Sequence, residues 1–377
     1  MKLRFNENGK FKILLFGDIH ESGDYKTNPK FADMHKMMNA ALDEFKPDLC
    51  VLLGDNCDGG VCKESPEKFK EMVADLIEPI TRRGIPAAAI MGNHEHDHGV
   101  DGEIVAAYNS IDGCIMRNDA PGITGAANFK EIIYSSDGEK PAFCLWFIDS
   151  NNLCDDKSVS NYDYVHADQI EWFEAESAKL REQNGGEPLP SFVFQHIPVP
   201  EEYELLKKAK LFELPFSVKG FNSKNGTRYV KKSGVDGYLG EGPASPDYNS
   251  GQFESWKKVG GVLGAFFGHD HLNDFSGFVD GILLAQHKTA GFRAYTDGCR
   301  CGVRLVTIDE KNPEKFTHEF KHFKEFGLKC ECLGPVFKRI TDRQSFFINL
   351  GVRIAAGIAG VTALIFIICK LIEVFGG

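Results

Sequence analysis

The segment Phe11-Lys-Ile-Leu-Leu-Phe-Gly-Asp-Ile-His20 joins a short apolar run to a polar turn. Its first six residues are mostly apolar, as expected of a strand buried in a sheet, and the run ends abruptly at a Gly-Asp pair. The same arrangement returns where Leu49–Leu53 precedes Gly54-Asp55 and where Ala87–Met91 precedes Gly92-Asn93. Three buried strands that each deliver polar residues to a loop predict a site at the carboxyl edge of a sheet.

Helical periodicity separates these runs. Apolar residues at helical spacing predict helices over residues 31–45 and 66–83, the second opened by Pro66. Alternating strands and helices predict an α/β fold. The stretch 201–258 is richer in Gly, Lys, Ser and Asn and is predicted to be a partly irregular insertion. Further runs predict a helix over 167–183 and strands over Phe129–Tyr134, Phe143–Ile148, Phe192–Phe194, Val262–Phe267, Ile282–Gln286 and Val303–Ile308.

The composition restricts the class of protein. A chain of 377 residues with 42% hydrophobic and 26% charged residues is typical of a folded globular protein. The net charge of −11 argues against a protein that coats nucleic acid, because such binding depends on Lys and Arg neutralising phosphates. The first residues have no apolar stretch of the kind found in a secretory signal, so we expect a cytoplasmic compartment with reduced thiols.

The eleven cysteines form no compact framework. Two pairs, Cys299-x-Cys301 and Cys330-x-Cys332, together offer four thiols to a zinc ion. Paired thiols in zinc sites usually have two or more residues between them, so the spacing favours reduced, unliganded cysteines over such a site.

The C-terminal part of the chain is strongly apolar. Between Arg353 and Lys370 lies an uncharged run of 16 residues. That run alone covers about 24 Å, and apolar residues on either side extend it towards the thickness of a bilayer core. Its small residues and all-round apolar surface favour membrane insertion over a buried core helix or an interfacial helix. We therefore predict one large domain at 1–335, a basic linker at 336–345 and a transmembrane segment at 346–375.

The charges around the apolar run predict its orientation. Basic residues precede it at Lys338, Arg339, Arg343 and Arg353, and only Lys370 follows it. The positive-inside rule then leaves the large domain in the cytoplasm.

Five short motifs carry groups that bind metal ions. Carboxylates together with imidazoles suit Mn, Fe or Zn better than Ca or Mg. In Asp-x-His and His-x-His, alternate residues of an extended segment face one side, so both can reach one metal pair. One such motif is common without a metal, whereas five in one chain predict a dinuclear site. The motifs are Gly17-Asp18-Ile19-His20, Gly54-Asp55-Asn56, Gly92-Asn93-His94-Glu95, Gln195-His196 and Gly268-His269-Asp270-His271.

This ordered set resembles the calcineurin-like metallophosphoesterase superfamily. The segments Gln195–Glu201 and Gly268–Phe275 are similar to the branch related to purple acid phosphatases that lacks the extra N-terminal domain. The resemblance covers about residues 11–309 and does not include the apolar tail. It implies a four-layer αββα sandwich, with two β-sheets flanked by helices and the site on one edge. The domain at 1–335 would then be a metallophosphoesterase catalytic domain.

The resemblance also implies a role for each motif residue. His94 matches the histidine that lies beside the metals and assists the leaving group in the family. One metal ion would be held by Asp18, His20 and His271, the other by Asn93, His196 and His269, and Asp55 would bridge the two.

One position departs from the purple enzymes. In those enzymes a tyrosine three residues after the bridging aspartate gives the ferric colour, whereas here that position is Asp58 and the first motif supplies His20. We therefore expect a colourless enzyme with two divalent ions drawn from Mn, Fe and Zn. Cys57 is expected to be a small buried residue and not a soft ligand.

The implied reaction is hydrolysis of a phosphomonoester by a hydroxide that bridges the metal ions, with His94 as general acid. One alternative is a phosphodiesterase or pyrophosphohydrolase acting on nucleotides or lipid-linked phosphates. Another is a non-catalytic membrane-tethered scaffold. A phosphate ester and a membrane are the expected partners, and no nucleic-acid surface is evident. Five lysines of the insertion are candidates for phosphate contact, with solvated charges as the favoured interpretation: Lys207, Lys208, Lys219, Lys231 and Lys232.

Several neighbours of the motifs have expected supporting roles. Glu95 and Asp270 are expected to orient metal ligands. His96 and His98 are expected to be solvated loop residues. His287 is expected to approach the site, because the matching strand does so in the family.

Overall fold

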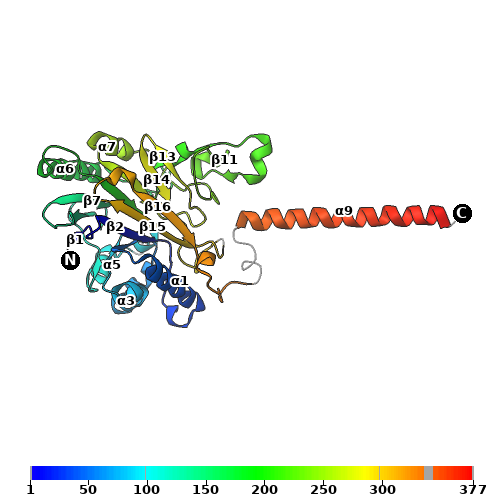
Figure 1. Ribbon diagram of the computed structural model, residues 1–377, viewed down its shortest axis with the longest axis horizontal. Coiled ribbons are helices and arrows are strands. Elements are labelled where there is room, and N and C mark those ends of the chain that lie inside the picture. Colours follow the sequence, from blue (N-terminus) through cyan, green and yellow to red (C-terminus); the bar gives the residue numbers. More distant parts are fainter. Residues whose placement is uncertain (1, 98, 297, 335–342, 376–377) are drawn as a thin grey trace.

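The computed structural model describes residues 2–97, 99–296, 298–334 and 343–375. Two β-sheets face each other, and helices cover both outer faces (Figure 1). The first sheet has the order β16 (Thr317–His322), β15 (Gly302–Asp309), β2 (Lys10–Phe16), β3 (Leu49–Leu52), β4 (Ala87–Ala89) and β5 (Cys114–Ile115). The second has the order β1 (Leu3–Arg4), β6 (Phe129–Tyr134), β7 (Pro141–Phe147), β8 (Ser191–Gln195), β12 (Val262–Phe267), β14 (Ile282–Gln286) and β13 (Ser276–Val279). A small third sheet has the order β10 (Val218–Lys219), β11 (Arg228–Lys231) and β9 (Leu206–Lys208).

The helices connect and cover these strands. The α-helices are α1 (Pro29–Phe45), α2 (Gly59–Glu64), α3 (Pro66–Thr81), α4 (Asn93–His96), α5 (Asp101–Asn109), α6 (Ala167–Gln183), α7 (Gln252–Val259) and α9 (Arg343–Phe375). Short 3-10 turns lie at Tyr25–Thr27, Pro200–Leu205, Leu211–Phe216, Asn222–Lys224, Pro313–Lys315 and Phe323–Phe326.

Strand β2 shows why both faces of the first sheet are buried. Its residues alternate, so that Phe11, Ile13 and Leu15 join the core between the two sheets. Leu14 and Phe16 point the other way and join the core beneath the helices. The strand pairs in parallel with β3 and antiparallel with β15. An apolar run without clear alternation is what a strand covered on both faces requires.

Three hydrophobic cores define the layers. The first lies between the helices and the first sheet and includes Met37 of α1 and Leu76 of α3. The second lies between the two sheets and is rich in phenylalanine. The third lies between the second sheet and its helices and includes Phe173 of α6 and Trp256 of α7. The predicted four-layer αββα sandwich is therefore confirmed.

The parallel strands bring their loops to one edge. β2, β3 and β4 run parallel in the first sheet, and β8 and β12 run parallel in the second. Each of the five metal-binding motifs begins at or just beyond the carboxyl end of one of these strands. The two sheets thus place loops from five separate parts of the chain around one point.

The predicted strands and helices are present, and the structure adds several short elements that were not predicted. β16 was not predicted, because the sequence Thr317–His322 alternates between exposed and partly buried residues at an edge and has no apolar run. The stretch predicted to be a partly irregular insertion, 201–258, contains the third sheet and α7. The side chains of Phe253 and Trp256 on α7 pack into the core over the second sheet, so this helix belongs to the sandwich.

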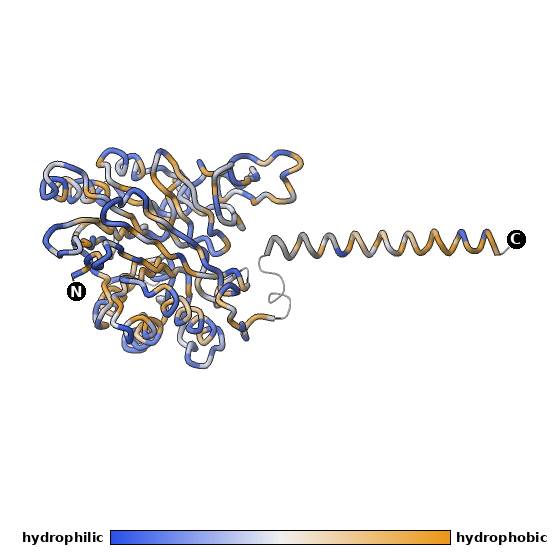
Figure 2. Tube along the Cα trace, viewed as in Figure 1, coloured by the Kyte–Doolittle hydropathy of each residue, from blue (hydrophilic) through white to orange (hydrophobic). Residues whose placement is uncertain are grey.

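Helix α9 stands apart from the sandwich (Figure 1). Its segment Arg353–Phe375 is 23 residues long, has a mean hydropathy of 2.3 and is long and apolar enough to cross a membrane. None of its most apolar window is buried in the structure, whereas the core helix of a soluble domain is mostly buried. Figure 2 shows that apolar residues dominate this helix. α9 begins at Arg343, inside the predicted linker 336–345, and residues 335–342 lie outside the described ranges.

Candidate metal centre

The predicted metal ligands converge at the edge where the loops meet. Three groups of ligand atoms each lie within 4.8 Å of one another. They consist of Asp18, His20 and His271; of His20, Asp55 and His94; and of Asp55, His196 and His269. Because His20 and Asp55 belong to more than one group, the three groups form one continuous cluster. Asn93 joins it through its Oδ1, which lies 3.1 Å from Nε2 of His196.

The backbone at this edge is held in an unusual conformation. Four of the seven predicted ligands have positive φ angles, with 54° at Asp18, 57° at His20, 49° at Asp55 and 77° at His269. Residues other than glycine rarely adopt positive φ angles, and each such residue costs of order 1–3 kcal/mol of folding free energy. Such strain is retained where the surrounding structure imposes it, as at ligand sites. Gly92 is needed for another reason, because a Cβ there would overlap the carboxylate of Asp55.

The first half of the cluster contains Asp18, His20 and His271. Nε2 of His20 lies 3.1 Å from Nε2 of His271, and Nε2 of His271 lies 3.6 Å from Oδ1 of Asp18. Nδ1 of His271 donates to the carbonyl oxygen of Tyr295 at 3.0 Å. A carbonyl only accepts, so Nδ1 carries the hydrogen and Nε2 presents its lone pair to the cluster.

The second half contains Asp55, His196 and His269. Nε2 of His196 lies 3.1 Å from Oδ2 of Asp55, and Nδ1 of His196 donates to the carbonyl oxygen of Leu53 at 2.8 Å. Oδ2 of Asp55 also lies 3.8 Å from Nε2 of His20, so this carboxylate faces both halves. Nε2 of His269 is buried without a hydrogen-bond partner among the described residues. An orphaned, buried imidazole nitrogen that faces a carboxylate fits a metal ligand.

The electrostatics of the cluster fit bound cations. Burial lowers the pKa of His20 to about 3 and that of His271 to about 4, so both imidazoles are neutral, as metal ligands are. Burial, together with the nearby Asp55, raises the pKa of Asp18 well above its usual range. Burial alone would lower the pKa of His196, but Asp55 outweighs it and raises that pKa to about 10. Divalent cations would supply the positive charge that two buried carboxylates require.

Glu95 holds the loop of Asp55 in place, as expected of a residue that orients ligands. Its carboxylate accepts hydrogen bonds from the backbone N–H groups of Asp55 at 2.8 Å, Asn56 at 2.9 Å and Gly92 at 2.9 Å. Asp270 does not act in the same way. It accepts from the N–H of Ala244 at 3.1 Å, so it fixes a neighbouring loop and no ligand side chain.

His96 is not the solvated loop residue that we expected. Its side chain is 9% exposed, and its two ring nitrogens contact Asp149 at 2.8 Å and Asp101 at 2.9 Å. Burial would lower its pKa, but these carboxylates outweigh burial and hold the pKa well above its ordinary value. Asp149 follows β7 without any metal-binding motif, which is why sequence reasoning missed it. His98 lies outside the described residues.

His94 lies at the exposed rim of the cluster. Its side chain is 49% exposed, and its ring packs edge-on against His20 with 5.1 Å between centroids. Nδ1 of His94 contacts Oδ2 of Asp97 at 2.7 Å. Nε2 is the ring nitrogen that does not take part in this contact. The backbone N–H of His94 donates to Oδ1 of Asp55 at 2.8 Å and ties this residue to the cluster.

Two aromatic residues that sequence reasoning missed line the cluster. Tyr295 stacks on His271 with 4.1 Å between centroids, and its hydroxyl donates to Glu241. Tyr162 packs edge-on against His269 at 4.3 Å. Both come from loops far from the motifs in sequence, so no local signal marked them.

Three further residues have defined places. His287 is fully buried and contacts the carbonyl oxygen of Leu15 through Nε2 at 2.9 Å, so it lies behind the β2 loop and outside the groups of ligand atoms. Cys57 is buried, as expected, and burial raises the pKa of its thiol. Asp58, at the position of the purple enzymes' tyrosine, is exposed and caps α2 by accepting from the N–H of Gly60.

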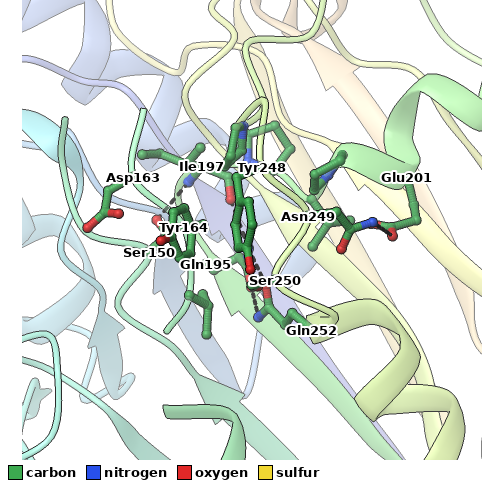
Figure 3. Close-up of a pocket in the computed structure, with 15 residues that line it drawn as sticks. Ser150, Asp163, Tyr164, Gln195, Ile197, Glu201, Tyr248, Asn249, Ser250 and Gln252 are labelled. Atoms are coloured by element: carbon green, nitrogen blue, oxygen red, sulfur yellow. Dashed lines mark hydrogen bonds between the residues drawn. The ribbon is translucent and has the colours of Figure 1, made fainter. Parts of the chain in front are cut away.

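A small pocket lies beside the cluster and is lined by residues that flank His196 (Figure 3). The amide of Gln252 donates to Oε1 of Gln195 at 2.6 Å, and the N–H of Ile197 donates to Oγ of Ser150 at 2.9 Å. None of the seven predicted ligands lines this pocket. These hydrogen bonds hold the side chain of Gln195 and the backbone of Ile197 on the two sides of His196, so the pocket supports the cluster without being part of it.

The profile of the calcineurin-like phosphoesterase family matches residues 11–273. This chain belongs to that family. Among its relatives, the protein named "Probable inactive purple acid phosphatase 29" from Arabidopsis thaliana is 28% identical over 341 residues, which cover 83% of this chain and 80% of the relative. "Phosphatase DCR2" from Saccharomyces cerevisiae is 26% identical over 292 residues, which cover 73% of this chain and 46% of that protein. The resemblance to purple acid phosphatases is thus confirmed by relatives of that name.

A solved structure is also similar in outline. The crystal structure of a dimetal phosphatase from Danio rerio gives a TM-score of 0.45 at 12% identity, over 79% of this chain and 95% of that one.

Proposed function

We propose that this phosphoesterase-family chain is an active dinuclear-metal phosphomonoesterase. The observation that carries the proposal is the completeness of the cluster, in which all seven predicted donors are present and close together. The name of the Arabidopsis relative includes the word inactive. A chain that had lost its activity would be free to lose ligands, and this chain retains them together with four strained backbone angles that stability alone disfavours.

The residues divide between two metal ions. Asp18, His20 and His271 would hold one, Asn93, His196 and His269 would hold the other, and Asp55 would serve both, because its carboxylate faces both halves of the cluster. A divalent pair of Mn, Fe or Zn, when bound, lowers the pKa of coordinated water and neutralises the charge of a phosphate ester. With an exposed Asp58 in place of the tyrosine, the protein is colourless.

His94 donates a proton to the leaving group. Asp97 contacts Nδ1 and thereby directs Nε2 towards the open face of the cluster. The exposed position of His94 lets the leaving alkoxide reach it. A general acid in this place favours esters with poor leaving groups, because these need the proton most.

The test uses the full chain in detergent, stripped of metal and then given Mn²⁺. Hydrolysis of p-nitrophenyl phosphate is compared with that of bis(p-nitrophenyl) phosphate. Metal-restored cleavage of the monoester supports the proposal. Cleavage of the diester alone would instead establish a phosphodiesterase, and two bound metal ions without cleavage of either would favour a scaffold.

The lysines of the 201–258 insertion do not favour a diesterase. Nζ of Lys207 pairs with Glu213 at 2.8 Å, and Lys231 donates to the carbonyl oxygen of Gly237. The ammonium groups of both lysines thus contact residues of the insertion itself.

We also propose that the chain is anchored to a membrane through residues 346–375, joined by the linker 336–345 to a cytoplasmic catalytic domain at 1–335. The apolar segment Arg353–Phe375 and the excess of basic residues before it support this arrangement. The 3-10 turn Leu211–Phe216 supports it too, because Leu211 is 85% and Phe212 is 73% exposed. In Figure 1 the part of the insertion that carries β11 lies on the same side of the sandwich as α9.

Extraction of membranes with alkaline carbonate tests the anchor. The wild-type chain is expected to remain in the pellet, and the double substitution Leu364→Arg/Ile368→Arg is expected to release it. A matched control, Phe278→Arg, changes an exposed apolar residue on the sandwich and is expected to stay in the pellet. Release of the wild-type chain would contradict the proposal.

A further inference from the structure

Four cysteines from two distant C-x-C pairs meet beside α1. Cys299 and Cys301 precede β15, and Cys330 and Cys332 follow the last 3-10 turn of the sandwich. Sγ of Cys330 lies 3.6 Å from Sγ of Cys332. The thiol of Cys299 forms a hydrogen bond with that of Cys330, and Cys301 lies close enough to Cys299 to interact with it electrostatically. The four cysteines are therefore neighbours in the fold, and we call them the thiol cluster. Within it, the ligand atoms of Cys330, Cys332 and Asp33 lie within 4.8 Å of one another.

Backbone hydrogen bonds align the two segments that carry the thiols. The N–H of Lys324 donates to the carbonyl oxygen of Cys299 at 3.1 Å, and that of Phe323 donates to the carbonyl oxygen of Cys301 at 2.7 Å. These bonds fix Cys299 and Cys301 against the turn that precedes Cys330. The cluster is built into the fold at the start of β15 and does not depend on a chance contact of two loops.

Asp33 on α1 positions the Cys330–Cys332 turn. Its Oδ2 accepts from the backbone N–H groups of Glu331 and Cys332, both at 2.8 Å, and lies 3.4 Å from Sγ of Cys330. Its other oxygen pairs with Lys36 at 3.0 Å. A fully buried carboxylate thus holds the turn in the shape that brings its two sulfurs together.

The 3.6 Å between the sulfurs of Cys330 and Cys332 fits shared binding of a metal ion. A tetrahedral zinc site has Zn–S distances of about 2.3 Å, which place neighbouring sulfurs about 3.8 Å apart. A disulfide would require about 2.05 Å, and no disulfide joins the cysteines of the described chain. Zinc with four thiolates is the arrangement that structural zinc sites commonly use. The C-x-C spacing argued against this site, but the tertiary structure brings Cys299 of the second pair into hydrogen-bond contact with Cys330.

We propose that Cys299, Cys301, Cys330 and Cys332 bind one structural Zn²⁺, separate from the dinuclear centre. The ion replaces four thiol protons, which pass to solvent, and it needs no redox partner. It cross-links the start of β15 to residues 328–334. That segment is the part of the sandwich from which the chain continues towards α9, so the ion fastens the catalytic domain at the point where it is tethered.

The first test uses the wild-type full chain, purified in detergent under reducing conditions. An organomercurial reagent is added while a chromogenic chelator reports free Zn²⁺. The dinuclear centre has no sulfur ligand, so the reagent is expected to release one Zn²⁺ per chain, all of it from the thiol cluster. Complete modification of the thiols without release of zinc would overturn the proposal.

The second test replaces the native zinc by Co²⁺ and compares visible spectra. Four thiolates around tetrahedral Co²⁺ give strong sulfur-to-metal charge-transfer bands, which nitrogen and oxygen ligands do not give. We expect these bands in the wild type and in the control Cys369→Ser, whose cysteine is exposed on α9. We expect their loss in Cys330→Ser/Cys332→Ser. Absence of the bands from the wild type would overturn the proposal even if the double variant fails to fold.

Discussion

The proposed dinuclear centre and the thiol cluster are both groups of side chains that could bind metal ions, but the chain builds them in opposite ways. The dinuclear centre takes its ligands from loops at the carboxyl ends of five parallel strands, and four of those ligands have positive φ angles. The thiol cluster takes its sulfurs from two short connections next to α1. Asp33 accepts hydrogen bonds from one connection, and the N–H groups of Phe323 and Lys324 donate to the other.

The difference indicates what each cluster is for. Strained loops at an open edge keep ligands ready for a substrate, and His94 stands exposed beside them. The cysteines of the thiol cluster have no positive φ angles and pack in or against the core beneath the helices, so the cluster can join chain segments. We therefore expect changes in the first cluster to alter activity and changes in the second to alter stability.

The largest expected effect is that of Asp55→Asn. Asp55 faces both halves of the dinuclear centre, so the variant should lose metal and reduce kcat on the order of 10³-fold. Hydrolysis of p-nitrophenyl phosphate at saturating Mn²⁺, with metal content measured in parallel, checks this. Asp43→Asn, a change of an exposed carboxylate on α1, is the matched control and should retain full activity. Near-normal activity of Asp55→Asn would contradict the role of Asp55 in the dinuclear centre.

The substitution His94→Asn separates chemistry from metal binding within the same cluster. It should keep both metal ions and lower kcat about 100-fold on an alkyl phosphate, which has a poor leaving group. The loss on p-nitrophenyl phosphate should be much smaller, because that leaving group needs little protonation. Equal losses on the two substrates would remove the role of general acid from His94.

The substitution Glu95→Gln tests the support beneath the Asp55 loop. An amide offers one acceptor where the carboxylate offers two, so some of the N–H groups that Glu95 binds lose their partner. Metal affinity should fall roughly 10–100-fold, with kcat nearly restored at saturating Mn²⁺. Titration of activity with Mn²⁺ measures both quantities. Glu103→Gln, on the exposed face of α5, should bind Mn²⁺ like the wild type.

The smallest expected effect on activity is that of Cys330→Ser/Cys332→Ser. Its kcat should stay near that of the wild type, while its Tm should fall by several degrees, since 1 kcal/mol shifts the Tm of a domain of 150–250 residues by roughly 2–4 °C. Thermal denaturation beside Cys369→Ser measures the shift. A loss of activity as large as that of Asp55→Asn, with an unchanged Tm, would reverse the roles assigned to the two clusters.

The sequence predicted the fold well where the hydrophobic pattern of a single segment was enough to identify a helix or a strand. The helix over 167–183 and the strands Phe129–Tyr134 and Val262–Phe267 match the structure, because their hydrophobic periodicity is local. β16 escaped prediction because an edge strand buries too little to show an apolar run. The solvated His96 that we expected is instead clamped between Asp149 and Asp101, and no local pattern records such distant partners.

The sequence by itself identified the side chains that meet at the carboxyl edge of the sheets and the order in which strands deliver them. It could do so because a parallel strand directs its loop to the carboxyl edge whatever lies elsewhere in the chain. Only the tertiary structure decided that His20 and His271, 251 residues apart, would lie 3.1 Å from each other. It likewise decided that Cys299 and Cys330 would meet, since burial against α1 and β15 sets that distance and local spacing does not.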